Sequence, residues 1–171
     1  MSAAWSNLPL IEKLHRSHNV EPFDCGQVDL NRFLIRHALQ SQQSNAATTY
    51  VALVEQEVVG FYALVVGQIE YADAPERLTK GPARHPVPVM LLARLAVATV
   101  WQGKGLGAGM LKDAMQRTLQ AAEIAGLRAL SAHAKDDSAR AFYERFNFQP
   151  SPTDPYHMAV LLKDVRASLQ A

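Results

Sequence analysis

The sequence predicts an α/β protein of the mixed α+β kind, in which a sheet is flanked by helices. Two segments rich in Val, Tyr and Leu, Thr49–Glu55 and Val58–Gln68, have the composition of paired strands. An apolar segment, Val89–Ala98, precedes a glycine-rich turn and then a helical pattern. A strand-like segment and a capped helical segment follow again after Gly126. This alternation is typical of a sheet with helices packed on it.

The first half of the chain should begin with a short strand at Leu8–Lys13. A helix is expected over about Asp29–Ser41, because apolar residues recur there at helical spacing. The two strands Thr49–Glu55 and Val58–Gln68 should then pair antiparallel through Glu55-Gln56-Glu57. A loop rich in proline is expected from about Tyr71 to Pro88, and loops of such length are often functional.

The second half begins with Val89–Ala98, which has apolar residues on both faces and is expected to be a central strand. After the turn Gly103–Gly107, a helix should run towards Gly126, a plausible stop signal. Its predicted inner face consists of Met110, Leu111, Ala114, Met115, Thr118, Leu119 and Ala122.

Leu127–Ala134 should form the next strand, and Asp136 can cap the helix that follows it. The predicted inner face of this helix is Ala139, Phe142, Tyr143 and Phe146, and Asn147 can adopt the left-handed conformation at its end. The last two strands are expected at Phe148–Gln149 and Tyr156–Lys163.

The length of 171 residues predicts a single domain covering residues 1–171. Hydrophobic residues make up 49% of the chain and charged residues 19%, which excludes an intrinsically disordered protein. The net charge is only +1, but the stretch from Arg77 to Arg117 contains seven basic residues and one acidic residue, Asp113. This distribution is compatible with a local positive field.

Several classes of protein are disfavoured. Cys25 is the one cysteine, so no intrachain disulfide can form, and we expect Cys25 to be a small packed side chain. The N-terminus lacks a secretory signal pattern, and the longest apolar stretch, Val87–Val100, is short and carries Arg94. We therefore expect a cytoplasmic protein without a membrane span. His85, His133 and His157 appear isolated in the sequence, so no metal site is predicted.

The glycine-rich turn indicates a phosphate site, because glycines let the backbone approach an anion and the following helix presents free N–H groups. A P-loop would need a Lys-Ser/Thr pair, which Gly107-Ala108-Gly109 does not provide. Gly103-x-Gly105-x-x-Ala108 fits the loose dinucleotide-binding pattern. That fold requires an acidic residue at the end of the next strand, whereas Glu123 belongs to the predicted helix. The dinucleotide interpretation therefore remains a weaker alternative.

A third interpretation accounts for more of the chain. The segment Gln102–Gly107 resembles the Gln/Arg-x-x-Gly-x-Gly/Ala signature of the GNAT-superfamily N-acetyltransferases, whose turn binds the pyrophosphate of acetyl-CoA. The second motif of that family follows in the expected order, and the segment that resembles it is Asp136-x-x-Ala139-x-x-Phe142-Tyr143-x-x-x-Asn147-Phe148. Asp136 replaces the usual Asn, which puts a polar contact with the pantetheine arm in doubt, and Asn147 replaces Gly.

The resemblance implies the GNAT fold, a mostly antiparallel central sheet of six to seven strands flanked by helices, and acetyl-CoA as the cofactor. The cofactor-binding residues that it implies are Leu95, Ala96, Val97, Gln102, Gly103, Lys104, Gly105, Leu106, Gly107, Asp136, Ala139 and Phe142. It also implies that Tyr143 is the general acid towards the CoA sulfur. An ordinary tyrosine, with a pKa of about 10, is protonated at neutral pH and can donate.

The N-terminal half is similar to the TacT/AtaT-type toxins within this family. The similarity lies in Glu21–Gly26, in Leu30-Asn-Arg-Phe33-Leu34 and in Leu92–Val97. Proteins of this group acetylate the amino acid on aminoacyl-tRNA, stop translation and are neutralised by a ribbon-helix-helix antitoxin. The resemblance therefore implies an aminoacyl-tRNA substrate, an antitoxin partner and a homodimer.

The residue chemistry is consistent with this function. Backbone amides near Leu95–Val97 can donate to the thioester carbonyl or the pantetheine. No general base can be named, which favours an α-amine, because its pKa of about 7.7–8.0 lies well below the value of about 10.4 for lysine. The candidate tRNA-binding residues are Arg32, Arg36, Arg77, Lys80, Arg84 and Arg94, whereas Lys104 is expected to meet CoA phosphate.

Two other functions remain open at the level of sequence. The acceptor can be a small-molecule amine or a protein N-terminus, with the same cofactor chemistry. Alternatively, the chain is a non-catalytic CoA-binding or nucleic-acid-binding module, in which Tyr143 only packs in the core. For Arg94, the alternative to an RNA contact is an ion pair with a carboxylate inside the protein.

Overall fold

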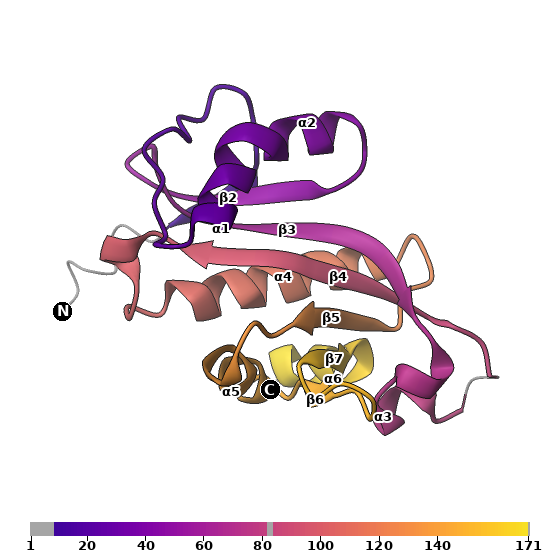
Figure 1. The fold of residues 1–171 in the computed structure, drawn as a ribbon. Coiled ribbons are helices and arrows are strands. Elements are labelled where there is room, and N and C mark those ends of the chain that lie inside the picture. Colours follow the sequence, from indigo (N-terminus) through magenta and orange to yellow (C-terminus); the bar gives the residue numbers. More distant parts are fainter. Residues whose placement is uncertain (1–8, 82–83, 171) are drawn as a thin grey trace. The chain divides into compact units, whose positions relative to one another are not determined.

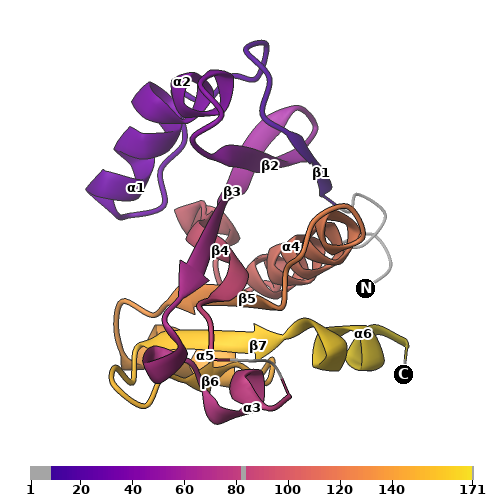
Figure 2. The same cartoon turned by 90° about the vertical axis from the view of Figure 1, so that its right-hand side faces the viewer.

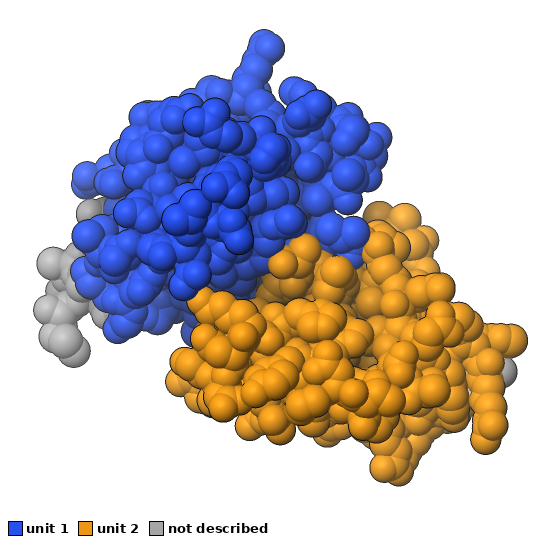
Figure 3. All heavy atoms as spheres, viewed as in Figure 1, with its two compact units in different colours: residues 1–65, 94–114 blue, residues 66–93, 115–171 orange. Residues whose placement is uncertain are grey.

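The computed structural model describes residues 9–81 and 84–170. In this part of the chain, seven strands form one sheet in the order β1-β2-β3-β4-β5-β7-β6 (Figure 1). The chain divides into two compact units, Met1–Val65 with Arg94–Ala114, and Val66–Ala93 with Met115–Ala171 (Figure 3). The predicted fold class, a mostly antiparallel mixed sheet with helices, is confirmed. β4 and β5 pair parallel, whereas β1 with β2, β2 with β3, β5 with β7 and β6 with β7 pair antiparallel.

The first unit contains the predicted antiparallel strands. β1 (Leu10–Lys13) pairs with β2 (Thr48–Val54), which pairs with β3 (Glu57–Ile69). Glu55 and Gln56 connect β2 and β3 with φ angles of +50° and +68°. Positive φ at both positions is the geometry of a two-residue hairpin turn that matches the twist of the strands. The strand predicted from Leu8 begins at Leu10, and Leu8 itself lies outside the described residues.

The predicted helix at Asp29–Ser41 is confirmed, but it is longer and less regular than expected. It consists of α1 (Val28–Arg32), the π-helical turn η2 (Phe33–His37) and α2 (Ala38–Gln43). In η2 the amide of Ala38 donates to the carbonyl of Phe33, five residues earlier. The wider turn brings these two residues to the same side of the helix, and both are buried.

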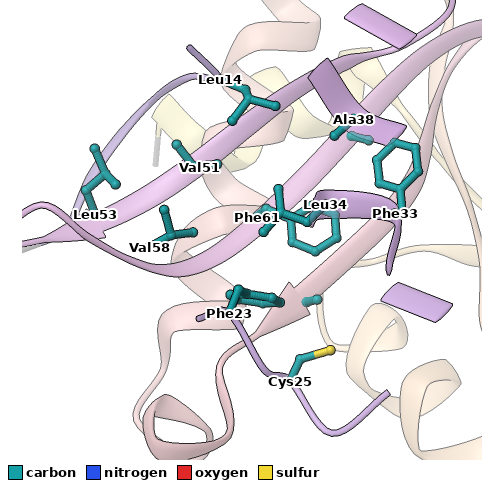
Figure 4. Packing of buried hydrophobic residues seen from close by; sticks show 12 residues of the cluster. Leu14, Phe23, Cys25, Phe33, Leu34, Ala38, Val51, Leu53, Val58 and Phe61 are labelled. Carbon is teal, nitrogen blue, oxygen red and sulfur yellow. The ribbon is translucent and has the colours of Figure 1, made fainter. Parts of the chain in front are cut away.

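The core of the first unit is built on Phe61 of β3 (Figure 4). The ring of Phe23 meets Phe61 edge-on at 5.5 Å, and the ring of Phe33 stacks on it at 6.1 Å. Cys25 is buried in the same cluster, which confirms it as a packed side chain. Next to this core, Gly60 lacks room for a side chain, because a Cβ there would lie 2.9 Å from the thioether of Met110.

Gln42 links the helical segment to two strands. Its side-chain Nε2 donates to the carbonyl of Leu14 at 2.7 Å, and its Oε1 accepts from the amide of Thr49 at 3.0 Å. The amide of Leu14 donates in turn to the carbonyl of Thr49 at 2.8 Å. One side chain thus satisfies backbone groups at the end of β1 and at the start of β2.

The second unit contains the parallel pair. Residues 89–92 of β4 (Val87–Val97) pair parallel with β5 (Ala129–His133), as expected for strands connected through a helix. β7 (His157–Leu161) lies antiparallel beside β5 and beside β6 (Gln149–Pro150) (Figure 2). The helix between β4 and β5 is α4 (Leu106–Ala122), as predicted.

Two expectations for this unit are wrong in part. The segment Tyr71–Pro88 is not all loop, because it contains η3 (Tyr71–Asp73), α3 (Glu76–Thr79) and the start of β4. Burial of Leu78, which is 1% exposed, anchors α3 in the core of this unit. Residues 82 and 83 of this segment lie outside the described residues.

The strand predicted at Tyr156–Lys163 ends at Leu161, and helix α6 (Leu162–Gln170) follows. The apolar run continues across this boundary, so composition alone does not mark it. Leu162 and Val165 are buried at helical spacing, which explains why the chain turns into a helix there. In the described ranges, no helix is long and apolar enough to cross a membrane.

The substitution Gln42→Ala should destabilise the protein by about 1–3 kcal/mol, because the Leu14 carbonyl and the Thr49 amide lose their partner. Urea unfolding measures this change. The matched control is Gln40→Ala, which truncates an exposed side chain of the same helix and should change the unfolding free energy by less than about 0.5 kcal/mol. Equal stabilities of the two variants would contradict the role of Gln42.

Candidate active site

The glycine-rich turn joins the end of β4 to α4 in the first unit. η4 (Thr99–Trp101) follows β4, and Gly103 and Gly105 then adopt φ angles of +77° and +87°. The carbonyl of Gly105 accepts the first helical hydrogen bond, from the amide of Gly109 at 3.1 Å. α4 therefore begins at Leu106, inside the segment that the sequence analysis assigned to the turn.

The turn presents a row of backbone donors. The amides of Gly103, Lys104 and Gly105 form no backbone hydrogen bond of standard geometry with a described residue. The amides of the first helical residues, Leu106 to Ala108, have no acceptor four residues earlier. A Cβ built on Gly103 or Gly105 would meet no atom within 4 Å, so the space on the side-chain side of both residues is open. Open amides at the start of a long helix fit an anionic ligand such as pyrophosphate.

Gln102 differs from its neighbours in the turn, because its side chain forms hydrogen bonds with backbone groups of the protein. The Nε2 group donates to the carbonyl of Val97 at 2.9 Å and to the carbonyl of Cys25 at 3.0 Å. Gln102 therefore holds the start of the turn against the end of β4 and against the loop that precedes α1. In this structure its side chain shapes the turn and has no amide hydrogen left over for a phosphate.

The remaining predicted residues of the first unit lie on both sides of Gln102. Ala96 of β4 is buried, and Leu95 and Val97 are half-buried. Lys104 is exposed, and its Nζ lies 5.3 Å from the centre of the Trp101 ring. No described carboxylate forms an ion pair with Lys104, so its charge adds to the positive end of α4.

The second motif lies on α5 (Asp137–Glu144) in the second unit. Asp136 caps this helix as predicted, because its carboxylate accepts from the amide of Ala139 at 2.8 Å. The carboxylate thus does at the helix start what the usual Asn of this motif can do. Asn147 ends the motif with a φ angle of +68°, the predicted left-handed conformation. Ala139 and Phe142 are half-buried.

Tyr143 is the most buried residue of the predicted inner face, with 7% of its surface exposed. Its ring packs against Phe142 at 5.3 Å and Phe148 at 5.1 Å. Loss of solvation in this apolar environment raises the pKa of Tyr143 to about 12. The raised pKa keeps the hydroxyl protonated at neutral pH. It forms no hydrogen bond with a described residue, so its proton is free to be donated.

His133 and His157 are not isolated, which corrects the sequence analysis. The register of β5 and β7 places them opposite each other, and their rings stack at 4.4 Å. His157 Nε2 lies 3.0 Å from the hydroxyl of Ser131, and burial lowers the pKa of His157. A separation of 24 residues hides this pair in the sequence, because only strand register brings it together. The described residues hold no group of three metal-ligating side chains.

Three predicted basic residues lie in the first unit. Arg94 packs its guanidinium on the Phe33 ring, at 3.7 Å from the ring centre, and forms no ion pair with a described carboxylate. Desolvation there lowers the pKa of Arg94. Arg36 is exposed, and Arg32 is exposed with an ion pair to Asp29 at 3.2 Å. Stacking on Phe33 replaces the inward ion pair considered for Arg94.

The other three basic residues lie in the second unit. Arg77 forms two hydrogen bonds with the carboxylate of Asp164, at 2.7 and 3.0 Å. This pairing raises the pKa of Arg77 and occupies its guanidinium, which weighs against a role in RNA binding. Lys80 is exposed with a loose contact to Glu76 at 3.9 Å, and Arg84 lies 5.7 Å from the centre of the Tyr71 ring.

Comparison with known proteins identifies relatives for most of the chain. Residues 45–150 match the model of the acetyltransferase (GNAT) domain. A tRNA-acetylating toxin of Mycobacterium tuberculosis is 44% identical over 155 residues, which are 91% of this chain and 93% of that protein.

Two solved structures share the fold. The structure of AtaT complexed with acetyl-methionyl-tRNAfMet has a TM-score of 0.87 and 26% identity, and the match covers 94% of this chain and 99% of AtaT. The structure of AtaTR bound with acetyl-CoA has a TM-score of 0.81 and 26% identity, over 95% of this chain and 98% of that one.

Tyr143 should ionise only at very alkaline pH. With a pKa of about 12, roughly a tenth of its hydroxyl is ionised at about pH 11, whereas roughly nine-tenths of an ordinary tyrosine is. Because the folded pKa is raised, its contribution to stability is lost as the pH rises from about 10 towards 12. Ultraviolet titration of tyrosinate in the wild type and in Tyr143→Phe measures the difference. Loss of a component that titrates near pH 10 in the variant would contradict this assignment.

Proposed function

The chain belongs to the acetyltransferase (GNAT) family, and we propose that it transfers the acetyl group of acetyl-CoA to the α-amino group of aminoacyl-tRNA and thereby blocks translation. The observation that carries this proposal is the 44% identity to a tRNA-acetylating toxin across nearly the whole of both chains. The likeness to AtaT in complex with an acetylated aminoacyl-tRNA supports the same acceptor.

The glycine-rich turn would hold the pyrophosphate of acetyl-CoA. Its amides from Gly103 to Ala108 are open, and Lys104 adds a positive charge beside them. Gln102 would position this turn through its two internal hydrogen bonds, without touching the phosphates itself. By the family motif, backbone amides of Leu95, Ala96 and Val97 would donate to the thioester and the pantetheine. By the same motif, the pantetheine would contact Asp136, Ala139 and Phe142.

Tyr143 would supply the proton in acetyl transfer. The neutral amine forms the new N–C bond at the thioester carbonyl, and the C–S bond breaks. Tyr143 donates its phenolic proton to the departing sulfur and recovers a proton from the acylated nitrogen, so that the products are the amide and the thiol. A phenol with a pKa of about 12 is a weaker acid than a thiol of about 8.5. Donation by Tyr143 is therefore favourable only when the nitrogen loses its proton in the same process.

The acceptor chemistry agrees with an α-amine. An α-amino group with a pKa of about 7.7–8.0 is partly neutral at physiological pH, so a strong general base is unnecessary. A lysine side chain, with a pKa of about 10.4, would depend on such a base. An α-amino group is common to all aminoacyl-tRNAs, so this chemistry does not select an amino acid or a tRNA.

The RNA would contact basic residues of the first unit, of which Arg32 and Arg36 are exposed and Arg94 is half-buried. Arg32 and Arg36 lie one helical turn apart, and Arg94 is fixed on Phe33 of the same helical segment. Lys80 and Arg84 are exposed and remain candidates, whereas Arg77 is held by Asp164.

We further propose that a ribbon-helix-helix antitoxin binds this protein and that the protein is a homodimer. Residues 1–171 would form a single catalytic domain, which would act in the cytoplasm.

Incubation with acetyl-CoA and total aminoacyl-tRNA should yield N-acetyl-aminoacyl-tRNA, detected by mass spectrometry of the released amino acids. The variant Tyr143→Phe should lose about 10²–10⁴-fold in kcat, the usual contribution of a positioned acid. Tyr156→Phe removes a hydroxyl that donates to Asp137 in the same unit, and we expect it to keep most of the activity. Unmodified tRNA, under conditions in which polyamines or peptide N-termini are acetylated, would refute the proposed acceptor.

Phosphate contacts should make catalysis sensitive to salt. Arg36→Ala should raise KM for aminoacyl-tRNA and reduce the slope of log KM against log salt concentration by roughly 0.7–0.9, the value for one phosphate contact. The control is Arg166→Ala, which removes an exposed positive charge on α6. If both variants change KM equally, the effect belongs to net charge and Arg36 has no specific contact.

A further inference from the structure

Two consecutive carbonyl groups of the loop before α1 hold the segment that leads into the glycine-rich turn. The carbonyl of Asp24 accepts from both the amide and the hydroxyl of Thr99, each at 2.9 Å. The next carbonyl, that of Cys25, accepts from Nε2 of Gln102 at 3.0 Å. The position of η4 and of the start of the turn therefore depends on the Asp24–Cys25 peptide, which carries the first of these carbonyls, and on the Cys25 carbonyl that follows it.

This peptide is itself held by one side chain, that of Asn31 in α1. The Oδ1 atom of Asn31 accepts from the amide of Cys25 at 2.8 Å, and Nδ2 donates to Oδ1 of Asp24 at 2.9 Å. The same carboxylate oxygen accepts from the amide of Gly26 at 2.9 Å, and Gly26 has a φ angle of +85°. The loop is thus folded around the carboxamide of Asn31.

A carboxamide suits this position, because it provides an acceptor and a donor on adjacent atoms. The Cys25 amide needs the acceptor, since Cys25 is buried and its N–H would otherwise lose a partner. The Asp24 carboxylate needs the donor, and its bonds to Gly26 and Asn31 lower the pKa of Asp24. An alanine at position 31 provides neither group, and an aspartate places a second negative charge beside Asp24.

We infer that Asn31 is a positioning residue for the cofactor turn: it sets the Asp24–Cys25 peptide, which in turn sets Thr99 and Gln102 at the entrance of the pyrophosphate site. The inference rests on the proposed binding of acetyl-CoA to that turn. Asn31 acts through backbone carbonyl groups and has no contact with residues 103–108 in the hydrogen bonds described above. Its effect should appear in the affinity for acetyl-CoA.

Isothermal titration of the RNA-free, full-length protein with acetyl-CoA tests this role. Asn31→Ala should raise Kd by about tenfold, and Asn31→Asp should raise it at least as much, because two carboxylates then face each other. The double variant Asp24→Asn/Asn31→Asp removes that repulsion and restores an N–H donor between the two side chains. It should therefore bind acetyl-CoA more tightly than Asn31→Asp. Gln40→Ala, in the same helical segment, should bind like the wild type.

Steady-state kinetics separate positioning from general destabilisation. We expect Asn31→Ala to raise KM for acetyl-CoA with a smaller change in kcat, at a temperature well below its measured Tm. Folded Asn31 variants that bind acetyl-CoA within about twofold of the wild type would overturn the inference. So would a folded double variant that binds no better than Asn31→Asp. Because the titration contains no RNA, it decides the role of Asn31 whether or not aminoacyl-tRNA is the acceptor.

Discussion

The backbone amides from Gly103 to Ala108 must stay without internal partners if they are to bind an anion, and this requirement governs the structure around them. A turn with open amides cannot stabilise its own shape through backbone hydrogen bonds. Its shape must be fixed from outside, by residues that precede it or lie far away in the sequence. Gln102 and Thr99 provide this support, and their acceptors belong to the loop at Asp24 and Cys25 and to the end of β4.

The same principle of support from outside applies to Tyr143. Its ring is fixed by apolar contacts with Phe142 and Phe148, which also exclude water and raise the pKa of the hydroxyl. The cap at Asp136 fixes the start of α5, and the left-handed Asn147 fixes the turn after it. Neither residue needs to touch the reacting atoms to determine where the hydroxyl lies.

Much of this could be predicted from sequence, because glycines, caps and apolar periodicity are local signals. Gly103 and Gly105 indicated the turn, Asp136 the helix cap, and Thr49–Glu55 with Val58–Gln68 the hairpin. The direction of a side chain is not a local signal. Gln102 belongs to the phosphate motif and yet its side chain donates to two backbone carbonyl groups of the protein, and Arg77 belongs to the basic stretch and yet pairs with Asp164.

Other features depended on contacts between distant residues. His133 and His157 meet through strand register, and the apolar run through Leu161 and Leu162 contains no marker for the change from strand to helix. The stacking of Arg94 on Phe33 joins positions 61 residues apart, so sequence could offer only an ion pair or an RNA contact as alternatives. In each case the local sequence permits more than one conformation, and a contact with a residue far away in the chain determines which one is adopted.

The π-helical turn at Phe33–His37 has a consequence for the permitted length of this segment. Removing one residue there would allow a continuous α-helix in which four residues span the rotation that the five of the wide turn span now, so later residues would keep nearly the same face. Gln42 would then still face the Leu14 carbonyl and the Thr49 amide. A deletion in the regular turns of α1 or α2 would instead rotate every later residue by about 100°, so Phe33–His37 is the place in this helical segment where the loss of one residue should be tolerated.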